Sequence, residues 1–134
     1  MSFVVDASVV AAWGLADESS DAADHLFVRA QNEGALIPNL LWYEVRNILL
    51  MAERRERILP RDADEFLSRF DKLPLTETRP AASRELMRLA RSHTLTAYDA
   101  AYLELALREH VSLATFDRKL AAAAVAEGLP LIFA

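Results

Sequence analysis

Four acidic side chains spread along the 134-residue chain are the residues best suited to do chemistry together. Asp6 directly follows the apolar run Phe3–Val5, and Asp117 follows the apolar segment 113–116, so both should lie at the carboxyl ends of strands. That rim is where open parallel sheets bind ligands. Taken alone, each aspartate is more often a turn former or a helix cap than a functional residue.

Glu44 and Asp99 are notable because both fall on the apolar stripe of an expected helix. Glu44 lies four residues after Leu40, and Asp99 lies four residues before Leu103. Such spacings put side chains on one helix face, and an ionised group on an apolar face needs a partner or a function. Glu44 could instead pair with an arginine across the core, and Asp99 could cap its helix together with Thr96.

Four carboxylates that converge at one rim would need a cation. At separations of roughly 6 Å and an effective dielectric of about 20, each pair repels by about 2–3 kcal/mol, and the summed repulsion rivals the stability of a domain. Such a cluster must take up protons or bind cations, and oxygen ligands without histidine or cysteine suit Mg²⁺ or Mn²⁺. This favours phosphoryl chemistry, in which a metal activates water and steadies the leaving oxygen.

The composition excludes several other chemistries. The chain has no cysteine, so a disulfide framework, a thiolate zinc site and a cysteine nucleophile are excluded. A hydrophobic content of 53% is ample for one core, and we expect one domain over residues 1–134.

We find neither a membrane-spanning run nor a signal peptide, and we expect a soluble, cytoplasmic protein with no membrane partner. The net charge of −5 argues only weakly against nucleic acid, because two divalent cations would offset most of it.

Short apolar segments alternate with stretches of helical periodicity, which predicts an α/β fold with a parallel sheet covered on both faces. The five expected strands are 3–5, 35–37, 75–76, 111–114 and 131–133. Capping and stop signals set the helix boundaries. The expected starts are Ser19 or Ser20, Asn39, Pro60, Pro80 and Thr96, and the stops after the first and last helices are Gly34 and Gly128.

Around the acidic residues the sequence resembles the PIN-domain ribonucleases, and most closely the VapC-type toxins of bacterial toxin–antitoxin pairs. The resemblance covers nearly the whole chain, from Ser2 to Phe133. Four segments carry it in the family's order: VVDASV (4–9), WYEVRN (42–47), LTAYDAAY (95–102) and LATFDRKL (113–120). One such segment would be weak support, but four at matching spacing are specific.

The resemblance implies a three-layer α/β/α sandwich whose five-stranded parallel sheet has the order 3-2-1-4-5. It also implies an endoribonuclease that uses metal-activated water and leaves a 5′-phosphate and a 3′-hydroxyl. By this likeness the catalytic, metal-binding acids are Asp6, Glu44, Asp99 and Asp117, holding one or two Mg²⁺ or Mn²⁺ ions. The supporting positions around them are Ser8, Asn47 and Thr115. The implied partners are an RNA substrate, a second copy of the chain, and a cognate antitoxin whose peptide segment covers the active-site groove.

Three basic residues adjoin these motifs in sequence and are candidate RNA contacts, although each could equally be an ordinary solvated charge. They are Arg46, Arg118 and Lys119.

Other function classes fit the sequence less well. The haloacid-dehalogenase-like phosphatases also place an aspartate after the first strand and use Mg²⁺, but they need a second acid where this chain has Ser8. A phosphoacceptor receiver domain needs an acid pair there, and only Asp6 is present. The three glycines are too few and too dispersed for a phosphate-cradling loop. A catalytically silent PIN-fold module that binds protein or RNA, and the identity of any RNA target, stay open.

Overall fold

The computed structural model describes residues 2–132, and its centre is a parallel sheet of short strands. These are β1 (Phe3–Val5), β2 (Ala35–Pro38), β3 (Leu75–Thr78) and β4 (Leu113–Ala114). In the central strand, Val4 lies opposite Leu36 of β2 on one side and Leu113 of β4 on the other. All three residues of β1 are fully buried, as expected for a central strand covered on both faces.

The expected fifth strand is contradicted by the structure. Over residues 2–132 the sheet has four strands in the order β3-β2-β1-β4, rather than five in the order 3-2-1-4-5. Leu131 forms only a single parallel bridge with Leu113, and Phe133 lies outside the described residues. The neighbouring Pro130 accepts a hydrogen bond from Leu113 N but has no N–H to donate, so the ladder cannot extend through it.

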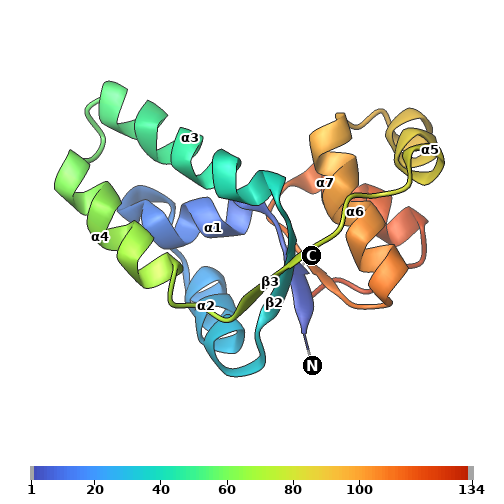
Figure 1. Cartoon of the computed structure of the whole chain (residues 1–134), viewed down its shortest axis with the longest axis horizontal. Coiled ribbons are helices and arrows are strands. Elements are labelled where there is room, and N and C mark those ends of the chain that lie inside the picture. Colours follow the sequence, from blue (N-terminus) through green and yellow to red (C-terminus); the bar gives the residue numbers. More distant parts are fainter. Residues whose placement is uncertain (1, 133–134) are drawn as a thin grey trace.

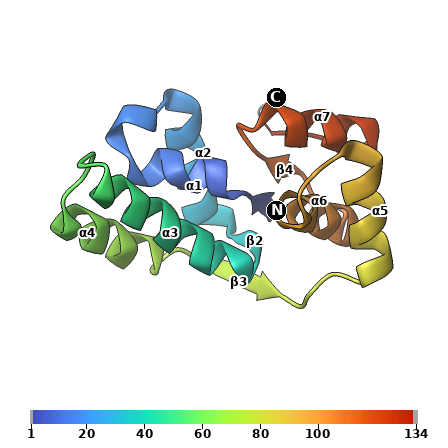
Figure 2. The same ribbon diagram turned by 90° about the horizontal axis from the view of Figure 1, so that it is seen from above.

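Helices cover both faces of the sheet, as the prediction of three layers requires (Figure 1). One layer contains α1 (Ala7–Gly14), the 3₁₀ turn η1 (Ala16–Glu18), α2 (Asp21–Glu33), α3 (Leu40–Arg54) and α4 (Pro60–Phe70). The other contains α5 (Ser83–His93), α6 (Ala97–Glu109) and α7 (Arg118–Ala126). Figure 2 shows the same separation from above. Within the described residues, every helix is too short or too polar to cross a membrane.

Local sequence signals account for many of the helix ends. Ser20 caps α2 and Thr96 caps α6, each by accepting a hydrogen bond from a backbone N–H of the first turn. One expected start was wrong, because α5 begins at Ser83 rather than at Pro80. Asn39 directly precedes α3, as expected, but its backbone is helical and its side chain makes no capping hydrogen bond.

No predicted element corresponds to α1, although this helix directly follows Asp6. Its sequence, ASVVAAWG, has no polar face and therefore gives no amphipathic period. Asp6 supplies the cap, because its side chain accepts a hydrogen bond from Val9 N. Helix α1 thus begins at the end of β1, and the residue that joins them is one of the four acids.

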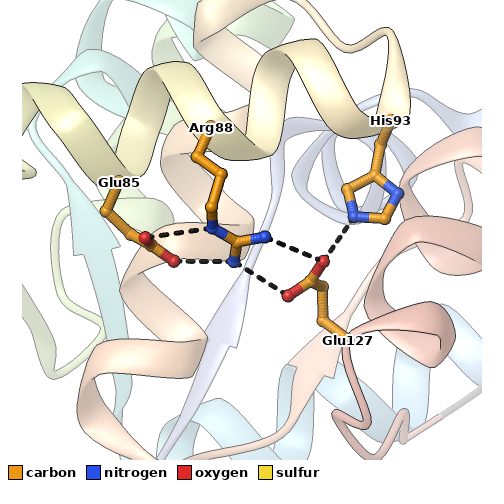
Figure 3. Close-up of polar contacts among 4 residues, drawn as sticks. All are labelled: Glu85, Arg88, His93 and Glu127. Atoms are coloured by element: carbon orange, nitrogen blue, oxygen red, sulfur yellow. Dashed lines mark hydrogen bonds and ion pairs between the residues drawn. The ribbon is translucent and has the colours of Figure 1, made fainter.

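A polar cluster fastens α5 to the end of α7 (Figure 3). Arg88 Nη2 lies 2.8 Å from Glu85 Oε1 and 2.9 Å from Glu127 Oε1. The second oxygen of Glu127 lies 2.6 Å from His93 Nε2. Glu127 and His93 are mostly buried, so the cluster links two helices that cover the same face of the sheet.

Candidate active site

Asp6 is held at the junction of two strands and a helix. Its backbone N–H donates to Ala114 O, which continues the pairing of β1 with β4 by one residue. Its side chain is 4% exposed, so the carboxyl group lies almost entirely out of water. A buried acid at the carboxyl edge of a parallel sheet has the placement expected of a ligand-binding group.

Two hydroxyl groups fix the orientation of the Asp6 carboxylate. Ser8 Oγ donates to Asp6 Oδ1 at 2.6 Å and accepts from Phe116 N at 2.9 Å. Thr115 Oγ1 donates to Asp6 Oδ2 and accepts from Asp117 N at 3.0 Å. Because each hydroxyl has one proton and already accepts from a backbone N–H, both are committed as donors to Asp6. The arrangement therefore suits the ionised form of Asp6.

The pKa of Asp6 is the outcome of opposing influences. Burial raises it above the ordinary value, and the negative charge of Asp117 raises it further. The hydrogen bonds from Ser8, Thr115 and the backbone of Val9 act in the opposite direction. Burial is the largest cause, so a cation beside the carboxylate would relieve the cost of keeping it charged.

Glu44 lies on α3 and is half-buried against α6. The hydroxyl of Tyr102, a residue that is 1% exposed, donates a hydrogen bond to Glu44 Oε1. Burial raises the pKa of Glu44, and the charges of Asp99 and Asp6 raise it further, while the Tyr102 hydrogen bond lowers it. Tyr102 was not identified as a site residue from the sequence. The available signal was general: a buried tyrosine hydroxyl needs a partner.

Asp99 and Asp117 complete the set from the first turn of α6 and the cap of α7. Burial raises the pKa of Asp99, as does the charge of Asp117, whereas the positive charge of Lys119 lowers it. Asp117 Oδ1 accepts from Leu120 N at 2.9 Å and so caps α7. At the start of α6 the capping oxygen is the hydroxyl of Thr96 instead, which accepts from the backbone N–H of Asp99.

The four acids lie within electrostatic range of one another, from four different elements of the fold. Asp117 acts on both Asp6 and Asp99, and both of those act on Glu44. Their oxygens do not form a ready-made cage: across residues 2–132 no three Asp, Glu, His or Cys side chains could hold one metal ion together. Mg²⁺ usually keeps several waters and is bound through one or two carboxylates, so this all-oxygen donor set fits a partly hydrated hard dication.

The remaining candidates occupy different surroundings. Arg46 lies over the Trp42 ring at 3.8 Å and 3.4 Å from Asp71, so it points back along its own helix. Asn47 is exposed and makes no side-chain hydrogen bond within the described part of the chain. Arg118 lines an open cavity of about 340 Å³ together with Thr115, Phe116 and Asp117. Of the three basic candidates, Lys119 is the one whose charge acts on an acid of the set.

The chain is similar to known proteins over most of its length. The PIN domain family matches residues 3–126, a range that includes all four acids. Ribonuclease VapC3 of Pyrobaculum aerophilum is 35% identical over 124 residues, which cover 90% of this chain and 93% of that protein. The crystal structure of PAE2754 from Pyrobaculum aerophilum matches with a TM-score of 0.68 and 27% identity, covering 92% of this chain and 86% of that one.

Proposed function

The chain belongs to the PIN-domain family, and from this premise we propose that it is a VapC-type endoribonuclease, the toxin of a toxin–antitoxin pair. The proposed reaction is metal-dependent hydrolysis of RNA phosphodiester bonds. We propose that Asp6, Glu44, Asp99 and Asp117 hold one or two partly hydrated metal ions, directly or through bound water, and the proposed partners are RNA, a cognate antitoxin and a second copy of the chain. The name of the relative, Ribonuclease VapC3, supports RNA as the substrate, and the antitoxin is the partner that the resemblance to VapC-type toxins implies.

The observation that carries this proposal is the environment of Asp6. A carboxylate has about four lone-pair positions. Three are used by the hydroxyls of Ser8 and Thr115 and by Val9 N–H. The three donors favour the charged form of Asp6, but burial outweighs them and three further acids lie near, so a cation would stabilise this arrangement.

Mg²⁺ or Mn²⁺, one or two per site, would supply a Lewis acid that activates water and offsets charge on the phosphate. The residues of the chain set up this chemistry. Asp6 keeps one lone-pair position for the cation. Tyr102 donates to one oxygen of Glu44 and so leaves the other for a ligand. The positive charge of Lys119 lowers the pKa of Asp99, so Lys119 is one basic residue that could meet a phosphate there.

The test is cleavage of RNA by purified protein in Mg²⁺, in Mn²⁺ and in EDTA. We expect the wild type to cut in either metal, to leave 5′-phosphate and 3′-hydroxyl ends, and to be inactive in EDTA. Asp6→Asn and Asp99→Asn should each lower the rate by more than about a hundredfold, since changing even the groups that support a metal ligand costs about ten- to a hundredfold. The matched control is Asp64→Asn, because Asp64 is an exposed acid on α4, outside the set.

Two results would count against the proposal. Cleavage that survives both EDTA and the two substitutions would exclude the metal-dependent mechanism. Absence of cleavage with every RNA offered, by a protein that still binds RNA or an antitoxin, would favour a PIN-fold binding module. A small neighbouring reading frame for a DNA-binding antitoxin would support the toxin role.

A further inference from the structure

A second cavity lies beside the acids along the same edge of the sheet. It has a volume of about 240 Å³ and is lined, among others, by Pro38, Asn39, Arg79, Tyr98, Glu104 and Arg108. Pro38 is the last residue of β2, Asn39 follows it, and Arg79 follows β3, so the cavity lies over the carboxyl ends of these two strands. The acids occupy the same edge at β1 and β4. We call this cavity the Tyr98 pocket.

The pocket exists because one stripe of α6 carries small side chains where it faces α3 and α5. Ala97 and Ala101 line the cavity, and Glu104 and Arg108 follow on the same stripe at intervals of three and four residues. Methyl groups at the first two positions leave the space unfilled. Liquid water takes about 30 Å³ per molecule, so the pocket has room for roughly eight waters, or for one planar ring system.

The polar end of the pocket is a fixed guanidinium. Glu104 is 4% exposed, and its two oxygens accept from Arg108 Nε at 2.8 Å and Arg108 Nη2 at 3.1 Å. Arg108 Nη2 also donates to the backbone carbonyl of Arg79 at 3.1 Å. This bidentate pairing holds the guanidinium plane in one orientation. With Arg79, the pocket has two positive charges and one negative charge, in contrast to the anionic acids beside it.

Tyr98 forms the aromatic wall of the pocket and is 65% exposed. It directly precedes Asp99, so one turn of α6 carries both an acid of the candidate site and this ring. Aromatic rings and arginine planes are the surfaces on which proteins stack unpaired bases. A base that is paired and stacked within a duplex could not enter a pocket of this size.

We propose that the Tyr98 pocket is a subsite that receives one base of the RNA, next to the phosphate that lies at the acids. This inference rests on the proposed function and assigns to Tyr98, Arg108 and Asn39 a role in holding the substrate. The base stacks on Tyr98, the edge of the base meets Arg108 or Asn39, and Arg79 lies near the backbone of the strand.

The experiment measures binding and cleavage separately. Binding is followed by fluorescence anisotropy with a labelled single-stranded RNA of mixed sequence in Ca²⁺, and with the same RNA carrying one abasic nucleotide at each position in turn. The variants are Tyr98→Ala and Tyr98→Phe. The matched control is Tyr43→Ala, because Tyr43 is 69% exposed and directly precedes Glu44, yet does not line the pocket.

We expect Tyr98→Ala to weaken binding of the single strand by about five- to a hundredfold, the range for loss of one stacked base. Tyr98→Phe and Tyr43→Ala should change it by less than about twofold, because each keeps the ring in the pocket. In the wild type, one abasic position should weaken binding, and that penalty should vanish in Tyr98→Ala.

Three results would overturn the proposal: no binding of single-stranded RNA by the wild type, equal binding by Tyr98→Ala, or a penalty at no abasic position. A change in oligomeric state in Tyr98→Ala, seen by size-exclusion chromatography, would assign the pocket to a second copy of the chain instead. If the protein binds RNA through Tyr98 but does not cleave it in Mg²⁺ or Mn²⁺, the proposed function is wrong and the base subsite stands. If the protein cleaves RNA and both binding and cleavage are unchanged in Tyr98→Ala, the proposed function stands and the base subsite is wrong.

Discussion

Thr115 donates a hydrogen bond to Asp6 although the two residues are 109 positions apart in the sequence. Thr115 follows β4 and Asp6 follows β1, and these strands are neighbours in the sheet. The same hydroxyl accepts from Asp117 N, so its proton has Asp6 as its acceptor. One threonine therefore joins two acids of the candidate site, as acceptor from one and donor to the other.

Replacing Thr115 by valine should impair cleavage without emptying space, because valine has nearly the same shape. We expect kcat/KM to fall by about ten- to a hundredfold, as for other groups that hold a metal ligand. The Thr115 hydrogen bond lowers the pKa of Asp6, so its loss should move the acidic limb of the pH–rate profile to higher pH. Thr115→Ser keeps the hydroxyl and should keep the limb in place; an unmoved limb in Thr115→Val would contradict the role given to this hydroxyl.

Asp99→Asn should make the metal-free protein more stable while impairing cleavage. Burial and Asp117 raise the pKa of Asp99 in the fold, so its stabilising contribution is present below the unfolded pKa and is lost as pH rises through the folded pKa. In EDTA at pH 7.5 we expect Tm to be higher than that of the wild type by about 2–5 °C. At pH 3 the two proteins should melt together.

Mg²⁺ should make the Tm of the wild type higher than that of Asp99→Asn, because the metal binds the folded wild type more tightly than the folded variant. Thermal scans in EDTA and in Mg²⁺ for wild type, Asp99→Asn and the exposed control Asp64→Asn test this directly. A lower Tm for Asp99→Asn in EDTA would mean that the carboxylate stabilises the apo fold and is not under repulsion.

Glu127 should contribute stability that depends on pH in the opposite sense. The guanidinium of Arg88, and next His93, lower the pKa of Glu127 below its ordinary value. Its contribution is therefore present above the unfolded pKa and is lost as pH falls through the folded pKa. We expect Glu127→Gln to lower Tm by about 2 °C at pH 7 and by less as pH falls toward 3. Glu65→Gln, at an exposed acid on α4, is the control; an equal Tm deficit at both pH values would rule out the charge as its cause.

Two glycines with nearly equal φ angles differ in the space that a Cβ atom would meet. Gly34 has φ 75° and ψ 171°, and a Cβ there would lie 2.9 Å from the carbonyl oxygen of Pro74. Gly128 has φ 78°, with nothing within 4 Å of a Cβ. Gly34→Ala should lower the free energy of unfolding by about 3 kcal/mol, and Gly128→Ala by about 1 kcal/mol. Urea denaturation measures both, and equal losses would show that the Pro74 contact adds nothing.

The fold was predictable where a residue's neighbours in sequence determine its structure. The apolar runs at β1 and β2 and the caps Ser20 and Thr96 have local causes, and the structure confirms them. Helix α1 escaped prediction because it is apolar all round and only its burial reveals its role. The prediction of a fifth strand was wrong because an apolar run forms a strand only where it pairs over several residues, and here Leu131 forms a single bridge with Leu113.

The candidate site was predictable in residue type but not in its contacts. Acids at strand ends and on apolar helix faces can be found from spacing, and the structure places those four within electrostatic range; their catalytic roles stay a prediction. The partnership of Tyr102 with Glu44 joins two helices and has no local signal. Arg46 packs over Trp42, which lies four residues earlier on the same helix, a spacing at which side chains meet; its role as an RNA contact stays a prediction.

The span between Asp6 and Thr115 also bears on how such an enzyme is made and destroyed. A nascent chain that has not yet released its last segment from the ribosome lacks the hydroxyl that orients its first acid. A proteolytic fragment cut anywhere between them loses the covalent link that brings the two ends together. If the proposed activity is correct, half-made copies and fragments that carry only one end of the chain lack part of the site and should cleave RNA poorly.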